Sequence, residues 1–193
     1  MAEVLSFLDT LPSSNPSLHA AFTASLHIII SALHIYRQPR ELCLSFNGGK
    51  DSTVVLHLLR AALLRYGAPP LGAPAGPGAV YFSGSRGGAA ELPEVTSFTA
   101  ASESRYAFSV ETLAGFKEGL GALVARPEGE GRMRCVLMGT RADDPDGKSL
   151  IGPLFPHLAG VAARHARVPH PQLELRTGVG VLARRAAALL RAV

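Results

Sequence analysis

Residues 42–66, LCLSFNGGKDSTVVLHLLRAALLRY, decide the fold. The short apolar run over 41–46 is typical of a buried strand in a parallel sheet. Residues 47–51 have the composition of a turn. Apolar side chains at three- and four-residue steps then predict a helix over 52–66, with Gly67 as its C-terminal cap. A strand, a glycine turn and a helix in this order indicate an α/β protein.

The same alternation continues on both sides of this stretch. A helix is predicted over 17–36, ended by Pro39, because proline cannot continue a helix. Further strands are predicted over 79–82, 107–110 and 134–138, and further helices over 93–106, 113–126 and 179–193. Residues 67–78 predict a flexible Pro/Gly loop with almost nothing to bury, and 84–88 a second glycine-rich loop. The order of elements predicts an α/β three-layer sandwich with a central parallel sheet.

Composition limits the class of protein. The 193 residues are 47% hydrophobic, which predicts one globular domain with a real core. The two cysteines, Cys43 and Cys135, lie in apolar runs and predict buried free thiols in a reducing compartment. Residues 1–12 lack the basic start of a signal peptide, and no apolar run reaches about 18 residues. We therefore expect a soluble, cytoplasmic protein, whose net charge of +4 fits an anionic ligand.

The chemistry concentrates in the loop after the first strand. Gly48 and Gly49 carry no side chains, so their backbone N–H groups can approach an anion. The following helix adds its unpaired N–H groups and the positive end of its dipole. Ser52 and Thr53 add hydroxyl donors, and Lys50 adds a mobile cation. This combination predicts a polyphosphate site.

Two residues of the loop suggest more than anion binding. Asn47 and Asp51 beside a bound triphosphate could orient a nucleophile and hold Mg²⁺. The spacing differs from the Walker A pattern GxxxxGK[ST] and from the dinucleotide pattern GxGxxG. The competing interpretation is an ordinary strand–turn–helix connection, in which the glycines supply only positive φ.

Two motifs carry a resemblance to a known family. Residues 44–51, LSFNGGKD, and residues 139–145, GTRADDP, closely resemble the two signatures of eukaryotic-type FAD synthases. These are FMN adenylyltransferases with the fold of phosphoadenosine phosphosulfate reductases. Patches at 79–82, 92–94 and 116–120 agree in the same order, so that the resemblance covers residues 40–146. It implies an adenine nucleotide α-hydrolase-like, PP-loop fold over 40–146, preceded by a helical segment over 1–39 and followed by a divergent tail over 147–193 that belongs to the same domain.

The resemblance also implies roles for individual residues. The implied reaction transfers the adenylyl group of ATP to FMN, giving FAD and pyrophosphate, with no nucleic-acid or membrane partner. The implied catalytic residues are Asn47, Asp51 and Asp144. The implied ATP-binding residues are Ser45, Phe46, Asn47, Gly48, Gly49, Lys50, Asp51 and Ser52. The implied flavin-binding residues are Glu94, Gly139, Arg141 and Asp144, and the implied ligands of the Mg²⁺ cofactor are Asp51 and Asp144.

Departures from the family pattern keep other functions open. Ser52 stands where the family usually has cysteine, Ala142 and Asp143 replace an arginine and a threonine, and the chain has no tryptophan. A serine at this position is similar to the SGGxDS loop of the wider group of PP-loop ATP pyrophosphatases. Another ATP pyrophosphatase activity is therefore the first alternative function. Sulfonucleotide reduction would need a reactive cysteine near the C-terminus, and none follows Cys135. The last alternative is a catalytically degenerate paralogue that only binds nucleotide or a partner protein.

Overall fold

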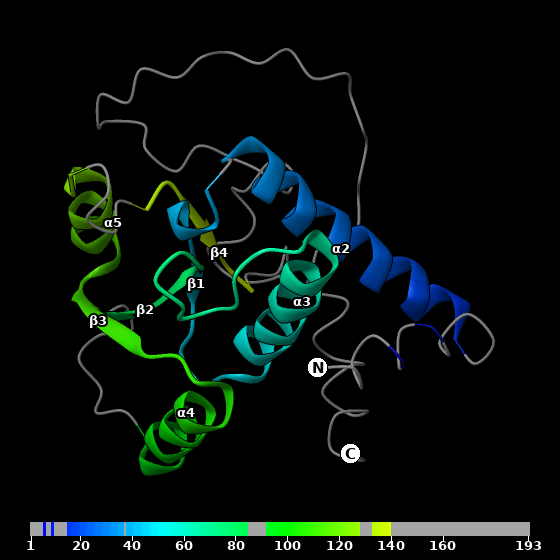
Figure 1. Ribbon diagram of the computed structural model, residues 1–193. Coiled ribbons are helices and arrows are strands. Elements are labelled where there is room, and N and C mark those ends of the chain that lie inside the picture. The colour runs from blue at the N-terminus through cyan, green and yellow to red at the C-terminus, as the bar shows by residue number, and fades with distance from the viewer. Residues whose placement is uncertain are drawn as a thin grey trace.

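The computed structural model describes residues 6, 9, 15–36, 38–84, 92–127 and 133–139. Figure 1 shows the arrangement of the helices and strands in this part of the chain. The helices are α2 (Pro16–Ile35), α3 (Lys50–Tyr66), α4 (Pro93–Tyr106) and α5 (Phe116–Ala125), with a short 3-10 turn over Pro39–Glu41. The strands are β1 (Leu42–Ser45), β2 (Gly78–Ser83), β3 (Val110–Ala114) and β4 (Cys135–Leu137).

All four strands run parallel, in the order β3-β2-β1-β4. Leu44 of β1 lies opposite Ala79 of β2 on one side and Leu137 of β4 on the other. Parallel strands place their carboxyl ends at one edge of the sheet, where α/β proteins bind ligands. Because β1 lies between β2 and β4, the loop that follows β1 lies between the ends of its two neighbours.

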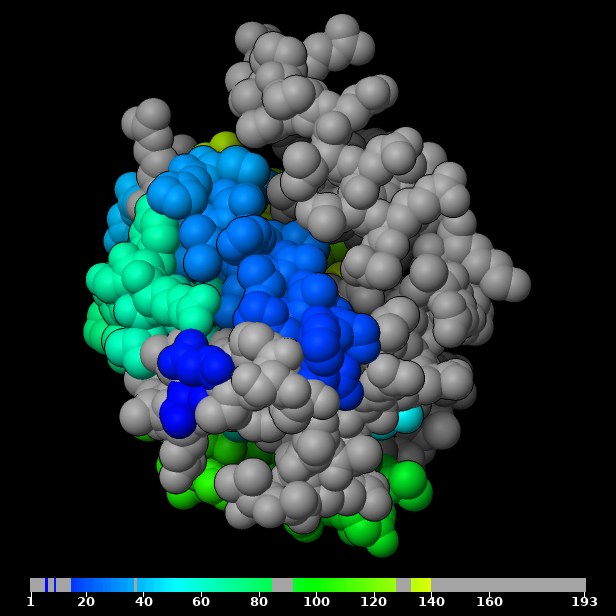
Figure 2. Space-filling view, turned by 90° about the vertical axis from the view of Figure 1, so that its right-hand side faces the viewer, coloured from blue at the N-terminus to red at the C-terminus, as the bar shows by residue number. Residues whose placement is uncertain are grey.

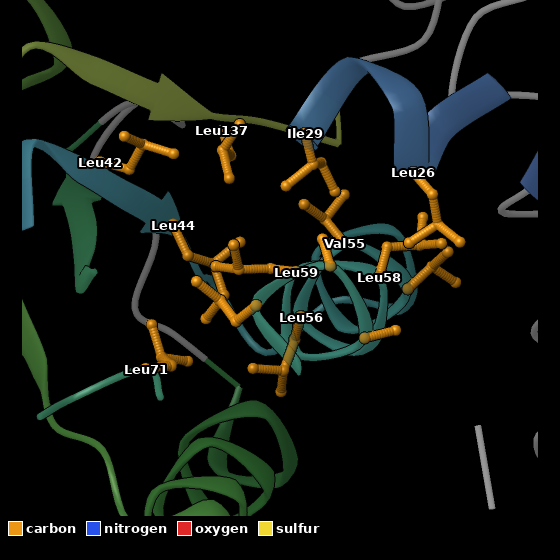
Figure 3. Close-up of a cluster of buried hydrophobic side chains, with 14 of the residues drawn as sticks. Leu26, Ile29, Leu42, Leu44, Val55, Leu56, Leu58, Leu59, Leu71 and Leu137 are labelled. Atoms are coloured by element: carbon orange, nitrogen blue, oxygen red, sulfur yellow. The ribbon is translucent and has the colours of Figure 1, made fainter. Parts of the chain in front are cut away.

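Helices α2 and α3 build the main core on one face of the sheet. Figure 3 shows Leu59 of α3 directed toward Leu44 of β1, and Ile29 of α2 directed toward Val55 of α3. Helix α3 therefore packs between the sheet and α2, and Figure 2 shows α2 along the outside of this face. Full burial of a leucine or isoleucine contributes about 1.5–3 kcal/mol. This packing holds the first turn of α3 at the carboxyl end of β1.

Helix α5 covers the opposite face. Its Leu120 and Leu123 pack with Cys43, Val80 and Phe82 of the central strands. The α/β sandwich with helices on both faces of a parallel sheet is thus confirmed. The alternation of side chains along β1 turns Cys43 toward α5 and its neighbours Leu42 and Leu44 toward α3.

The two cysteines are free and lie on different faces of the sheet. Cys43 is buried beneath α5, whereas Cys135 packs against the core that α2 and α3 form. Burial raises the pKa of both thiols, that of Cys135 to about 11. Both therefore stay protonated at neutral pH and act as small apolar side chains.

The sequence predicted most elements within one or two residues, with three corrections. The helix expected over 113–126 begins only at Phe116, because Leu113 and Ala114 belong to β3. The strand expected over 107–110 begins only at Val110, because Ala107 adopts a left-handed conformation that caps α4 and Phe108 turns into the core. The expectation that the loop over 67–78 has almost nothing to bury is wrong. Leu71 is buried, and a bond from Gly72 N–H to the Pro77 carbonyl closes a compact turn. The helix predicted over 179–193 lies outside the described residues.

Helix α2 is long and apolar enough to cross a membrane, by length and composition alone. Its Leu26, Ile29 and Leu33 are buried in the core that α3 shares. The apolar composition of α2 therefore has a structural explanation within the domain, as in the core helix of a globular protein.

Candidate functional site

The loop over 46–49 is anchored at its first residue. Phe46 is fully buried, its N–H donates to the carbonyl of Val80 at 2.8 Å, and its ring meets the Phe108 ring edge-on at 5.6 Å between centroids. The backbone N–H and the ring of Phe46 therefore both contact other parts of the protein. Phe46 lies in the loop predicted to bind ATP, but its side chain belongs to the core.

The turn itself depends on Gly48. Its φ of +66° is a left-handed conformation that favours glycine. A β-carbon at Gly48 would also lie 2.6 Å from Thr99 Oγ1 and 3.1 Å from the carbonyl oxygen of Val95. Helix α4 therefore closes tightly over one side of the loop. Apart from the pair of glycines, no sequence pattern points to this contact, so that Val95 and Thr99 are not among the site residues predicted from the sequence.

Side chains within the loop hold its shape. Asn47 Oδ1 accepts a hydrogen bond from Gly49 N at 3.1 Å and lies 2.8 Å from Ser52 Oγ. The Gly49 carbonyl accepts from both Thr53 N (3.0 Å) and Thr53 Oγ1 (2.9 Å). The loop is thus held in place by its own hydrogen bonds, so that a ligand bound there would require little further ordering.

Several donors of the loop remain available. The N–H groups of Gly48, Lys50 and Ser52 donate to no protein acceptor among the described residues. They lie at the N-terminal end of the 17-residue helix α3, where the helix dipole favours negative charge. The exposed Lys50 adds a positive charge at the same end. The arrangement can bind a polyphosphate through backbone amides.

The two sequence motifs meet at Asp51 and Gly139. A β-carbon at Gly139, just after β4, would lie 3.0 Å from both the carbonyl carbon and the carbonyl oxygen of Asp51. The pairing of β4 with β1 produces this contact between residues that are far apart in the sequence. Arg141 and Asp144, which continue the second motif, lie outside the described residues.

Metal ligands are scarce in this part of the protein. No group of three or more His, Cys, Asp or Glu side chains that could hold a metal ion occurs among the described residues. Asp51 supplies a half-buried carboxylate in the first turn of α3, beside the free amides. Glu94 lies exposed in the first turn of α4, next in the chain to Val95, which contacts the loop.

A cavity of about 220 Å³ adjoins Asn47. It lies between α4 and the face of β2 and β3, and its walls carry polar side chains. The lining residues are Phe46, Asn47, Tyr81, Thr96, Thr99, Ala100, Glu103, Val110 and Thr112. A larger cavity of about 520 Å³ lies at the amino ends of the strands, away from the loop, where Gly78, Phe108 and Met133 line it.

A cluster around Tyr106 joins α4 to α3. The Tyr106 ring meets the His57 ring edge-on at 5.5 Å, and the Arg60 guanidinium lies 4.1 Å from its centroid. Burial, together with the charges of Arg60 and Arg105, lowers the pKa of His57 to about 4. His57 is therefore neutral at physiological pH. The cluster fixes the C-terminal end of the helix whose N-terminal half closes over Gly48.

Comparisons with known proteins agree with this geometry. No family model matches the chain. Over 117 residues, 59% of this chain, it is 38% identical to a probable FAD synthase of Caenorhabditis elegans and equally to one of Caenorhabditis briggsae. The chain spans about a fifth of the length of these curated relatives, since the match covers 20% of each.

Solved structures share the fold. FMN adenylyltransferase of Candida glabrata, in complex with FAD and inorganic pyrophosphate, matches with a TM-score of 0.59 at 19% identity, over 77% of this chain and 52% of that one. Yeast FAD synthetase in complex with FAD matches with a TM-score of 0.57 at 21% identity, over 77% and 53%. The resemblance to eukaryotic-type FAD synthases, inferred from two motifs, is thus confirmed in sequence and in fold.

Proposed function

We propose that this chain binds ATP through the loop over 46–52 and transfers its adenylyl group to FMN, giving FAD and pyrophosphate. The observation that carries the proposal is the contact of Gly139 with Asp51, because it joins an anion-binding loop to the second signature of the family. The 38% identity to probable FAD synthases supports the same acceptor. A Candida glabrata FMN adenylyltransferase of similar fold binds FMN and the ATP analogue AMPCPP.

In the proposed reaction, an oxygen of the FMN phosphate attacks the α-phosphorus of ATP. A new P–O bond forms, the bond from the α-phosphorus to the oxygen bridging to the β-phosphate breaks, and pyrophosphate leaves with that electron pair. The free amides of Gly48, Lys50 and Ser52 are suited to hold the phosphates as negative charge shifts toward the leaving group. The main contribution of the loop is therefore alignment and neutralisation of charge.

Mg²⁺ fits the donor set that the loop offers. This ion takes one or two carboxylates together with phosphate oxygens, and Asp51 is a half-buried carboxylate beside the phosphate-binding amides. When bound, Mg²⁺ would neutralise phosphate charge. We propose Asp51 as one ligand and Asp144 as a second.

The flavin is proposed to lie toward the second motif and the start of α4. Gly139, the first residue of the second motif, lies against Asp51, which supports the proposal that Arg141 and Asp144 hold FMN. Glu94 is exposed close to the loop and is proposed to contact the same substrate. We also propose a cytoplasmic location, which the two free, protonated thiols support.

The test is direct: purified protein is incubated with FMN, ATP and MgCl₂, and the flavins are separated by chromatography. Formation of FAD with release of pyrophosphate supports the proposal. Binding of ATP without a new flavin product would support a nucleotide-binding paralogue instead. Release of AMP and pyrophosphate only with another acceptor would favour a different ATP pyrophosphatase, the alternative that Ser52 suggests.

A further inference from the structure

Ser52 is buried although it lies in the first turn of α3, directly after the proposed phosphate-binding loop. Ser52 is only 6% exposed. Its Oγ lies 2.8 Å from Asn47 Oδ1 and 2.9 Å from the Gly49 carbonyl oxygen. A serine hydroxyl has a single proton, so it can donate to only one of these two acceptors at a time. The choice between them determines what Ser52 does.

The Gly49 carbonyl is already occupied. It accepts from Thr53 N at 3.0 Å and from Thr53 Oγ1 at 2.9 Å, and a carbonyl oxygen has two lone pairs. The proton of Ser52 is therefore directed to Asn47 Oδ1, which is also the shorter of its two contacts.

This bond decides the orientation of the Asn47 amide. The Gly49 N–H can only donate, so the Asn47 atom it meets at 3.1 Å is the oxygen. Gly49 N and Ser52 Oγ both donate to Asn47 Oδ1, so this oxygen faces the loop. The Asn47 Nδ2 group therefore points away from these two donors. Asn47 is exposed, and Nδ2 donates to no acceptor among the described residues. The two N–H donors of Nδ2 are thus left for a ligand, on the residue that precedes Gly48, whose backbone N–H is also free of protein acceptors among the described residues.

We propose that Ser52 is a positioning residue of the nucleotide site, which holds the Asn47 amide so that Nδ2 donates to an oxyanion of the bound phosphates. Ser52 Oγ itself does not contact the nucleotide. The inference rests on the proposed binding of ATP, and it assigns the Ser52 hydroxyl an indirect role in place of the direct phosphate contact expected from the sequence, while the Ser52 N–H stays available to the phosphates. The negative charge of the phosphate makes a correctly oriented donor worth more than a neutral hydrogen bond.

A double-mutant cycle tests this role. Binding of AMPCPP with Mg²⁺ is measured by titration calorimetry for the wild type, Asn47→Ala, Ser52→Ala and the double variant, and kcat and KM for FAD formation are measured alongside. Asn47→Ala should weaken AMPCPP binding by about tenfold or more, and Ser52→Ala by about two- to tenfold. Because Ser52 acts through Asn47, the double variant should match Asn47→Ala within about twofold. If the double variant lost affinity for AMPCPP by the product of the losses in Asn47→Ala and Ser52→Ala, the two residues would act independently and the proposal would be overturned.

Conservative and control variants separate positioning from stability. Ser52→Thr keeps the hydroxyl and should restore most of the affinity, whereas Ser52→Cys, with its weak S–H donor, should fall between serine and alanine. Ser25→Ala removes an equally buried hydroxyl, 3% exposed and bonded to the Ala21 carbonyl inside α2. Its AMPCPP affinity should equal that of the wild type. An equal loss in Ser25→Ala and Ser52→Ala would mean that Ser52 matters only for stability.

A nucleotide-free measurement keeps the inference separate from the proposed function. Exchange of the Gly49 amide proton with solvent, followed by NMR, reports its bond to Asn47 Oδ1. Ser52→Ala should speed this exchange at least severalfold, and Ser25→Ala should not. If the wild type bound no AMPCPP, the proposed function would fail while the exchange rates still decided whether Ser52 orients Asn47. Unchanged exchange in Ser52→Ala would overturn the positioning role.

Discussion

Gly139 lies directly against the backbone of Asp51, so close that a β-carbon on Gly139 would come within 3.0 Å of the Asp51 carbonyl group. One residue follows the edge strand β4 and the other belongs to the first turn of α3. Their contact packs the end of β4 against the backbone of Asp51, in the first turn of α3. A side chain at position 139 would therefore require the Asp51 backbone to shift by a few tenths of an ångström.

Gly139→Ala should displace Asp51 by a few tenths of an ångström. Such a shift at a reacting centre should lower kcat for FAD formation by about tenfold, while unfolding free energy falls by about 1 kcal/mol. Kinetics and urea unfolding measure the two effects. The matched control is Gly121→Ala on α5, where the added β-carbon meets no atom within 4 Å. That variant should keep full activity, and equal kinetic losses in both would contradict the assigned contact.

Asp51→Asn and Asp51→Ala should each reduce FAD formation by about a hundredfold or more, because the charge beside the phosphates is lost. The fold should stay intact, with a loss of about 0.3–1 kcal/mol from the helix N-terminus. Circular dichroism and chromatography of flavins check both statements. Glu118→Gln removes an acidic residue from the first turn of α5 and should keep activity. Full turnover in Asp51→Ala would refute its role.

Gly48→Ala should lower the free energy of unfolding for two separate reasons. The positive φ costs roughly 1–2 kcal/mol for a residue with a β-carbon, and a β-carbon 2.6 Å from Thr99 Oγ1 and 3.1 Å from the Val95 carbonyl oxygen requires the Thr99 side chain or α4 to shift. Gly67→Ala isolates the first cost, since Gly67 has a φ of +71° and no neighbour within 4 Å. Urea unfolding should show the larger loss for Gly48→Ala, and Thr99→Ala in that background should recover part of the difference. Equal losses of unfolding free energy in Gly48→Ala and Gly67→Ala would mean that the contact with α4 is relieved at no cost in stability.

Stability should fall as the pH falls from about 6.5 toward 4, because of His57. Its pKa is lowered from 6.5 to about 4 in the folded protein, first by burial and then by Arg60 and Arg105. In this window the unfolded chain binds a proton that the folded chain does not, so unfolding becomes more favourable as pH decreases. After allowance for partial solvent exposure, the loss is on the order of 2 kcal/mol.

Urea unfolding at pH 7 and pH 4.5 measures this effect in the wild type and in His57→Gln. The variant should lose much of the difference between the two pH values. His34→Gln, which removes an exposed histidine from α2, serves as the control for a change of composition. If His57→Gln kept the full pH dependence of the wild type, the groups responsible would lie elsewhere.

Much of the fold could be predicted because its signals are local. The bounds of α4 (Pro93–Tyr106) follow from a proline at the first turn, and the end of α3 follows from Gly67, whose φ of +71° suits a helix cap. The start of β3 could not be predicted in this way. Phe108 looks like a strand residue in sequence, yet it packs edge-on against Phe46 before the strand begins.

The site divides along the same line. The turn between β1 and α3 could be predicted because its strand, glycines and helix are consecutive in the chain, and its binding of phosphate stays a prediction. The closure of α4 over Gly48 could not, because Thr99 lies on a helix whose position depends on Tyr106 and its contacts with α3. The meeting of Asp51 with Gly139 was implied by the family resemblance alone, since only strand order brings β4 beside β1.

The pairing of β1 with β4 has a consequence for how the protein folds. Arg134, just before β4, donates its N–H to the Glu41 carbonyl, just before β1, across a separation of 93 residues. Contacts between residues so far apart in the sequence form slowly, because closing the long intervening chain costs conformational entropy before the contact stabilises the fold. During synthesis, the phosphate loop can therefore form long before Gly139 has left the ribosome. Competence for chemistry would arise in a single late step, when the last described strand docks at the edge of the sheet.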